Sequence, residues 1–209
     1  MRISHLFILL AASAMLTACD FLDEYNPNSV TVGNYYTSEE DIVASLNGVY
    51  TSLTQSYVAD NYHYFTDVRA NATVVTNSGA NSGIPYQFYN YTLTEENVYV
   101  YNRYSQLYKI ISRANTLFAH LGDVSYATPS ARDTYEAEAR FLRAYFYFEL
   151  VKRYGGVPII GDKVYELNEN IELPRSTFEQ CIKYIVSELD DIKDDLRSLP
   201  LPDAAASAH

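Results

Sequence analysis

The stretch STFEQCIKYIVSELDDIKDDL, residues 176–196, carries the clearest structural signal in the chain. Its apolar side chains recur every three or four residues, which is the spacing of one face of an α-helix. The apolar members are Phe178, Cys181, Ile182, Ile185, Leu189, Ile192 and Leu196. The opposite side carries Asp190, Asp191, Asp194 and Asp195. With Ser176 and Glu179 as a capping box at its start, the stretch predicts an amphipathic helix that buries one face.

Two segments upstream have the same helical periodicity. Thr128 and Pro129 are typical of an N-cap and a first helical position, and Gly155 with Gly156 is typical of a helix end. The buried stripe expected between them is Ala137, Phe141, Ala144, Phe148 and Val151. An earlier helix, ending near Gly122, has one face made of Tyr104, Leu107, Tyr108, Ile111, Asn115 and Phe118. Because a short loop joins these two helices, they favour a helical hairpin.

A first helix is predicted from Glu39 to Tyr57. Thr37 and Glu40 fit a capping box at its start. Its apolar residues at helical spacing are Ile42, Leu46, Val49, Tyr50 and Leu53. Together the helices predict a mostly α-helical domain over residues 38–200, made of tetratricopeptide-like hairpins with long loops. No repeat of about 34 residues is visible, so a regular solenoid is not predicted.

The first eighteen residues have the character of an export signal. Arg2 supplies a positive charge, and residues 6–15 are almost wholly apolar but too few to cross a bilayer. Leu16-Thr17-Ala18-Cys19 has the form of a lipobox. We therefore expect residues 1–18 to be removed and Cys19 to be lipidated. The alternative is an ordinary secretory signal that happens to contain a cysteine.

Beyond this signal the chain is expected to be anchored to a membrane and not to span it. No later segment has the length and apolarity of a membrane helix. Residues 19–37 begin with an acidic stretch and predict a tether, and residues 201–209 predict a disordered tail. Cys181 has no partner once Cys19 is lipidated, so it is interpreted as a small buried hydrophobic residue.

The composition is acidic and rich in tyrosine. The chain has 26 Asp and Glu residues against 15 Lys and Arg, a formal net charge of -11. Removing the signal with its single arginine gives 14 minus 26, or -12. This charge argues against nucleic acid as a partner. The 21 tyrosines stand beside 9 phenylalanines and no tryptophan, and a tyrosine ring with its polar tip suits wet binding surfaces as well as cores.

Between Val58 and Asn97 the helical periodicity fades, and Asn, Ser, Gly, Thr and Tyr dominate. Long loops inside compact domains are usually functional or mobile. Sugar binding requires flat apolar surfaces for the pyranose ring and amide or charged groups for its hydroxyls. The candidate ligand-binding residues here are Arg69, Asn71, Asn77, Asn81, Tyr86, Phe88, Tyr89 and Tyr91. In the alternative interpretation, these aromatics cover the helices and the amides build turns.

No catalytic or metal-binding pattern emerges, and no cofactor is expected. The sequence lacks a phosphate-binding glycine loop, a nucleophile elbow and cysteine-histidine metal spacing. His63 is interpreted as a loop histidine. Arg140 and Arg143 lie three apart in an aromatic-rich helix, where a structural pairing with Glu136 or Glu149, or with tyrosine rings, is expected.

Four segments carry a family pattern. They are ACDFLD (residues 18–23), LYKIISRAN (107–115), EARFLRAYFYF (138–148) and RYGGVP (153–158). Together they resemble the SusD-like family of surface nutrient-binding lipoproteins, and the last two are the most specific. The likeness extends from Cys19 to about Pro200.

This resemblance implies an incomplete SusD-like fold, because members of the family are usually far longer. It also implies a binder without enzymatic activity, held on the outer membrane by its lipid and exposed at the cell surface. Such a protein delivers oligosaccharides or similar nutrients to a SusC-like TonB-dependent transporter. The alternative is a helical-repeat scaffold lipoprotein that binds other envelope proteins.

Overall fold

The computed structural model describes residues 35–75, 83–165, 169 and 172–197. Its α-helices in this part of the chain are α3 (Glu39–Thr51), α4 (Gly83–Tyr89), α5 (Val98–His120), α6 (Ala131–Tyr154) and α7 (Phe178–Arg197). A 3-10 turn, Ser52–Thr54, follows α3, and a π-helix spans Tyr64–Val68. The predicted signal, Cys19, most of the tether and the tail at 201–209 lie outside the described residues.

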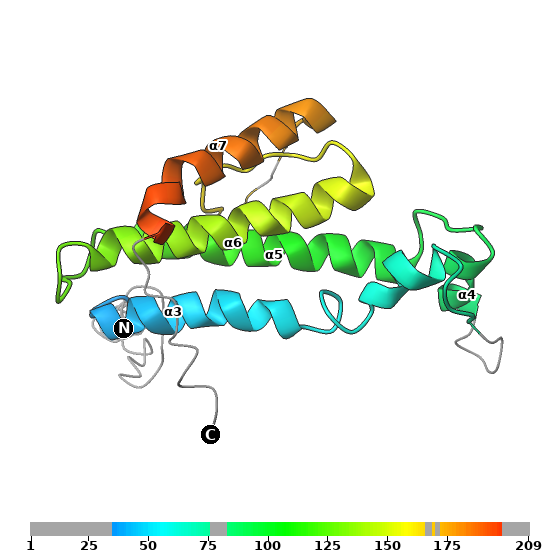
Figure 1. Ribbon diagram of the computed structural model, residues 1–209, viewed down its shortest axis with the longest axis horizontal. Coiled ribbons are helices and arrows are strands. Elements are labelled where there is room, and N and C mark those ends of the chain that lie inside the picture. The colour runs from blue at the N-terminus through cyan, green and yellow to red at the C-terminus, as the bar shows by residue number, and fades with distance from the viewer. Residues whose placement is uncertain (1–34, 76–82, 166–168, 170–171, 198–209) are drawn as a thin grey trace, which may run out of the picture. The chain divides into compact units, whose positions relative to one another are not determined.

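The prediction of a mostly α-helical fold is confirmed. Helices α5 and α6 form the long hairpin, α7 packs along α6, and α3 lies against α5 and α6 (Figure 1). The core between them includes Ile42, Leu107, Ile111, Phe146, Leu150, Cys181 and Ile185. Cys181 is a free, buried thiol, as predicted. Within the described residues, no helix is long and apolar enough to cross a membrane.

The N-caps lie one or two residues later than predicted, although α3 itself begins at Glu39 as predicted. Ser38, and not Thr37, caps α3: its backbone N–H donates to the Asp41 carboxylate at 3.0 Å, and its hydroxyl accepts from the Asp41 backbone N–H. Thr177 and Gln180 form the reciprocal pair before α7 in place of Ser176 and Glu179, while α6 starts at Ala131. Each predicted cap is followed one or two residues later by another Ser or Thr, so the sequence offered two registers.

The region predicted to lack helical periodicity contains two short helices, the π-helix and α4. Aromatic packing explains them, because Phe88 of α4 contacts Phe65 of the π-helix with ring centroids 4.9 Å apart. The first helix ends at Thr51, before the predicted Tyr57. Helix α5 begins at Val98 because the Asn97 side chain accepts hydrogen bonds from two backbone N–H groups of its first turn.

The buried stripe predicted for α6 was partly wrong. Ala137, Ala144 and Val151 are buried, but Phe141 is 44% exposed and Phe148 is 42% exposed. Because α3, α5 and α7 all pack on α6, its buried surface is wider than one stripe and includes Leu142, Phe146, Tyr147 and Leu150. Phe141, Tyr145 and Phe148 share the remaining outer face, which we call the α6 aromatic face.

Arg143 and Arg140 have the structural role predicted for them, but with different partners. Both bind Glu188 of α7, at 2.5 Å from Arg143 and 3.0 Å from Arg140. Arg140 also reaches Asp191, and Arg143 lies over the Phe118 ring at 4.5 Å. The ion pairs with Glu188 and Asp191 join α6 to α7, and the contact with Phe118 joins α6 to α5.

Glu149, proposed above as a partner for these arginines, pairs instead with buried Arg103 of α5 at 2.9 Å. Lys152 and Arg153 bind the same carboxylate. Burial alone would raise the pKa of Glu149, but Lys152, Arg153 and Arg103 outweigh it and hold that pKa below its ordinary value. The carboxylate therefore stays ionised inside the bundle.

Replacing Glu188 with alanine should destabilise the protein strongly. It leaves the Arg143 guanidinium buried without its main counter-charge, a situation that costs about 3–5 kcal/mol. The matched control is Asp191→Ala, because the Asp191 side chain is 58% exposed and an exposed pair is worth under about 1 kcal/mol. Urea denaturation measures both, and equal losses of unfolding free energy would contradict the argument.

Candidate functional site

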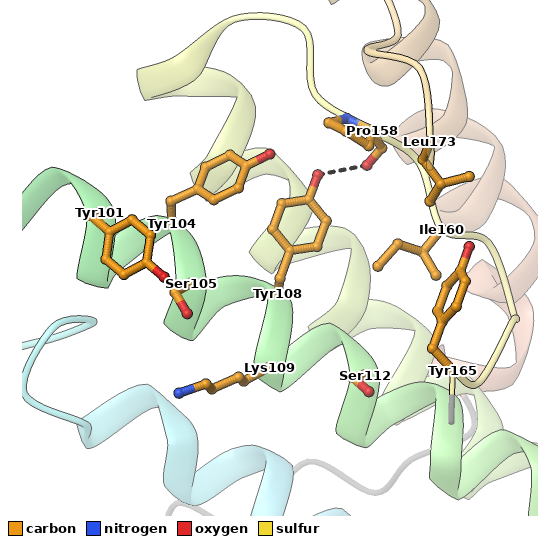
Figure 2. A pocket seen from close by; sticks show the side chains of 10 residues that line it. All are labelled: Tyr101, Tyr104, Ser105, Tyr108, Lys109, Ser112, Pro158, Ile160, Tyr165 and Leu173. Carbon is orange, nitrogen blue, oxygen red and sulfur yellow. Dashed lines mark hydrogen bonds between the residues drawn. The ribbon is translucent and has the colours of Figure 1, made fainter. Parts of the chain in front are cut away.

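One face of α5 forms the wall of a cleft of about 470 Å³. The residues lining this tyrosine cleft are Tyr101, Tyr104, Ser105, Tyr108, Lys109, Ser112, Pro158, Ile160, Tyr165 and Leu173. Figure 2 shows Tyr101, Tyr104 and Tyr108 in a row along α5, with Tyr165 and Leu173 facing them from the segment that follows α6. A cleft of this volume is in the range of small-molecule sites.

The α5 wall follows from helical spacing. Tyr101, Tyr104 and Tyr108 are three and four residues apart, so they lie on one face of α5. The rings of Tyr104 and Tyr108 are 4.9 Å apart, and Tyr154 of α6 packs edge-on against Tyr104 at 5.1 Å. Tyr101 at the end of the row is 66% exposed. The stripe is thus half-buried at Tyr104 and Tyr108 and open to solvent at Tyr101.

The opposite wall includes a non-helical segment, residues 157–165, with a turn at Gly161, and side chains of the helices hold this segment in place. The Tyr108 hydroxyl donates to the Pro158 carbonyl at 2.6 Å (Figure 2). Asn115 of α5 donates to the carbonyls of Gly161 and Lys163 at 2.8 and 2.9 Å. Because a buried amide and a half-buried tyrosine hold it, this wall is positioned before any ligand arrives.

Helix α6 holds the same segment from its other side. The Ile160 backbone N–H donates to the Tyr147 hydroxyl at 2.9 Å, and burial raises the pKa of Tyr147 to about 12. Arg143 donates to the Gly161 carbonyl and to Asp162, whose carboxylate is 2.6 Å away. Burial also raises the pKa of Tyr108 well above its ordinary value, so its hydroxyl remains a donor at physiological pH.

The tyrosine cleft combines flat rings with hydroxyl and ammonium groups. Ser105 and Ser112 supply hydroxyls beside the ring stripe, and Lys109 supplies a positive charge. Lys163 lies over the Tyr165 ring at 4.2 Å and pairs with Glu169 at 2.7 Å, so it holds this ring at the rim. Rings for C–H faces and polar groups for hydroxyls are the features that sugar binding requires.

The structure divides the ligand residues predicted from the sequence. Arg69 and Tyr91 come together: the guanidinium lies 5.1 Å from the ring centroid, and the Tyr91 hydroxyl donates to the Arg69 carbonyl at 2.7 Å. Tyr86 and Tyr89 form a second pair, with ring centroids 5.6 Å apart. None of these four residues lines the tyrosine cleft.

Phe88 is a correction to that set. It is fully buried among the rings of Tyr64, Phe65 and Tyr99, so it has no face to offer a sugar. Asn71 is exposed, in the left-handed backbone region at φ 61°. Asn77 and Asn81 lie outside the described residues. His63 is exposed near the π-helix, with its Nδ1 2.9 Å from the Asp60 carbonyl.

Tyr91 has the same left-handed φ of 61°. A tyrosine in that region carries backbone strain on the order of 1–3 kcal/mol, and such strain is concentrated at functional positions. The pair of Arg69 and Tyr91 therefore remains a candidate for ligand contact.

Sequence reasoning assigned Tyr104 and Tyr108 to a buried helix face and missed the cleft beside them. The signal was present in the α5 segment, where tyrosines at positions 101, 104 and 108 run parallel to Ser105, Lys109 and Ser112. A stripe of rings flanked by a stripe of hydroxyl and amino groups marks the edge of a buried face. The facing wall has no such signal, because it comes from a segment some fifty residues away.

The sequence model of the SusD-like family described as "Starch-binding associating with outer membrane" matches residues 20–201. The chain belongs to the SusD-like family. The resemblance inferred from the four sequence segments is thereby confirmed. By that description the family binds starch and associates with the outer membrane.

Known SusD-like proteins match over most of this chain. The SusD-like protein P38 of Formosa agariphila is 25% identical over 93% of this chain and 38% of its own length. A structure described as a laminarin-binding SusD-like protein superposes with a TM-score of 0.69 at 25% identity, over 80% of this chain and 36% of that one. A SusD homologue from Bacteroides thetaiotaomicron gives a TM-score of 0.62 at 27% identity, over 79% of this chain and 31% of that one. The chain thus spans less than half the length of these relatives.

Replacing Asn115 with alanine should loosen the wall of the tyrosine cleft. It removes both hydrogen bonds to the segment 157–165 and the 2.8 Å bond that Arg143 donates to Asn115. Hydrogen exchange should become faster at the amides of residues 159–163. Thr116→Ala should leave it unchanged, because this half-buried neighbour on α5 bonds through its hydroxyl to the Ser112 carbonyl and not to the wall. An equal acceleration throughout α6 would show global unfolding and argue against a local anchor.

Proposed function

We propose that this chain is the amino-terminal helical part of a cell-surface lipoprotein that binds glycans for import and has no enzymatic activity. The observation that carries the proposal is the tyrosine cleft, in which a row of rings on α5 faces a fixed wall. Membership of a starch-binding family and the similarity to a laminarin-binding protein support glycans as the ligand class.

The chemistry of the cleft favours a sugar over a purely apolar ligand. Tyrosine rings offer flat faces to the C–H side of a pyranose, and a hydroxyl-rich ligand requires partners for each group it buries. Ser105, Ser112 and Lys109 lie within reach of the rings and provide such partners. The open end at Tyr101 leaves room for a chain of sugars to continue into solvent.

Replacing Tyr101 with alanine should weaken glycan binding without unfolding the protein. The ring is exposed, so its loss removes a stacking surface and little core packing. We expect affinity to fall about tenfold, equivalent to about 1.4 kcal/mol, in isothermal titration of the purified chain against a glycan panel. Phe178→Ala is the matched control, because Phe178 is also exposed, at 54%, and lies outside the cleft. Equal weakening by both substitutions would count against the site, and a folded wild-type chain that binds no glycan would count against the function.

The membrane anchor is the second part of the proposal. Cys19 would carry the lipid, and the helical part would lie outside the cell beside a SusC-like TonB-dependent transporter. Palmitate labelling should mark the wild-type protein and not Cys19→Ser, since that substitution removes the acceptor thiol.

Protease added to intact cells should remove the protein, and affinity capture from envelope extracts should recover a TonB-dependent barrel. Full protection from protease would place the protein in the periplasm instead.

The α6 aromatic face favours a second candidate function, a scaffold for envelope proteins. Three exposed rings on one helix form an apolar surface suited to a protein partner. Affinity capture separates the two functions. Recovery of envelope assembly proteins that is lost when Phe141, Tyr145 and Phe148 are replaced would favour the scaffold.

A further inference from the structure

The tyrosine cleft continues into a second cleft of about 350 Å³. The residues lining this Arg175 cleft are Tyr104, Tyr154, Gly156, Val157, Pro158, Leu173 and Arg175. Tyr104, Pro158 and Leu173 line both clefts, so the two form one groove along the start of α5 and the end of α6. A groove of this extent is suited to linked sugar rings and not only to a single ring.

The groove is positive, although the chain as a whole is acidic. Lys109 and Arg175 are the charged residues among those that line the two clefts, and no carboxylate is among them. This contrasts with 26 acidic and 15 basic residues in the whole chain. Two carboxylates of the neighbouring segment are already paired, Asp162 with Arg143 and Glu169 with Lys163.

The two groove cations also differ from the arginines of the core. Arg103, Arg140 and Arg143 each bind a glutamate, as the ion pairs described above show. For Lys109 and Arg175, the described part of the chain contains no carboxylate within ion-pair distance, so an acidic group on a ligand would be their counter-charge.

The Arg175 side chain is held in position by the backbone. Its Nε and Nη2 donate to the carbonyls of Gly156 and Tyr154. A Cβ at position 156 would lie 2.0 Å from the Ser176 carbonyl oxygen, so only glycine permits this close approach. These bonds use two of the five guanidinium N–H groups and fix its plane, which lowers the entropy lost when the remaining donors bind an anion.

We propose that this groove selects anionic oligosaccharides, whose carboxylate or sulfate substituents bind Lys109 and Arg175 while the tyrosine rings stack on the pyranose faces. The inference rests on the proposed glycan-binding function and names the class of glycan. Charge-assisted hydrogen bonds are about twice as strong as neutral ones, so the acid groups decide the selectivity and the rings contribute general affinity.

Isothermal titration of the purified chain with oligouronates and with their methyl esters tests the inference. The methyl ester keeps the sugar backbone and the chain length but removes the charge. We expect the acid form to bind at least tenfold more tightly, and its affinity to fall as salt rises. Sulfated oligosaccharides form a parallel arm that distinguishes carboxylate from sulfate recognition.

Two substitutions assign the effect to the groove. Lys109→Gln and Arg175→Gln should each lower affinity for the acid form about tenfold and leave affinity for the methyl ester unchanged. Lys183→Gln, an exposed lysine on α7 outside the groove, should change neither. If Arg175→Gln lowers the melting temperature, the result for Lys109→Gln decides. Lys109 is exposed on α5, so its substitution should not destabilise the fold.

The outcomes separate the inference from the proposed function. Equal affinity for acid and ester, or preference for neutral glucans, overturns the anionic selectivity and leaves glycan binding intact. Selectivity for the acid that survives both substitutions overturns the assignment to this groove. If no glycan of either charge binds a folded chain, the glycan-binding function fails as well.

Discussion

Two buried ion pairs on α6 determine how the helices of this domain align. Arg143 pairs with Glu188 of α7, and Glu149 pairs with Arg103 of α5. Apolar helix faces tolerate small displacements along each other, but a buried charge that loses its partner costs several kcal/mol. Because the two pairs involve different neighbours, α6 is fixed against α5 and α7 at the same time.

The same constraint builds the groove. The guanidinium of Arg143 that binds Glu188 also binds the Gly161 carbonyl and Asp162. The position of the cleft wall is therefore tied to the position of α7, and Asn115 bonded to Arg143 extends that link to α5. A wall fixed by the packing of the bundle needs no ordering when ligand binds, so less of the binding free energy is lost to conformational entropy.

How much the sequence predicted depended on whether a feature lies within one element. The amphipathic face of α7, the buried Cys181 and the end of α6 at Gly155 follow from spacing and residue type along a single segment. The exception on α7 is its first residue, Phe178, which was predicted on the buried face and is 54% exposed. The partners of Arg143 do not, because Glu188 is 45 residues away and is brought close only by the packing of α7. Phe148 was misassigned for a related reason. Three helices pack on α6 and widen its buried surface, so the buried residues of α6 do not follow a single helical spacing.

The tyrosines explain why the site itself was the least predictable feature. A tyrosine of this domain can join a segment to a helix through its hydroxyl, as Tyr126 does at the Leu121 carbonyl and Tyr154 at the Val100 carbonyl. It can also present its ring to a cleft, as Tyr101 does. Tyr108 does both, since its hydroxyl holds Pro158 while its ring lines the groove. Phenylalanine lacks the hydroxyl for the first role, so a fold that holds its loops this way is rich in tyrosine. Composition alone therefore does not distinguish the tyrosines that hold a segment from those that line a binding cleft.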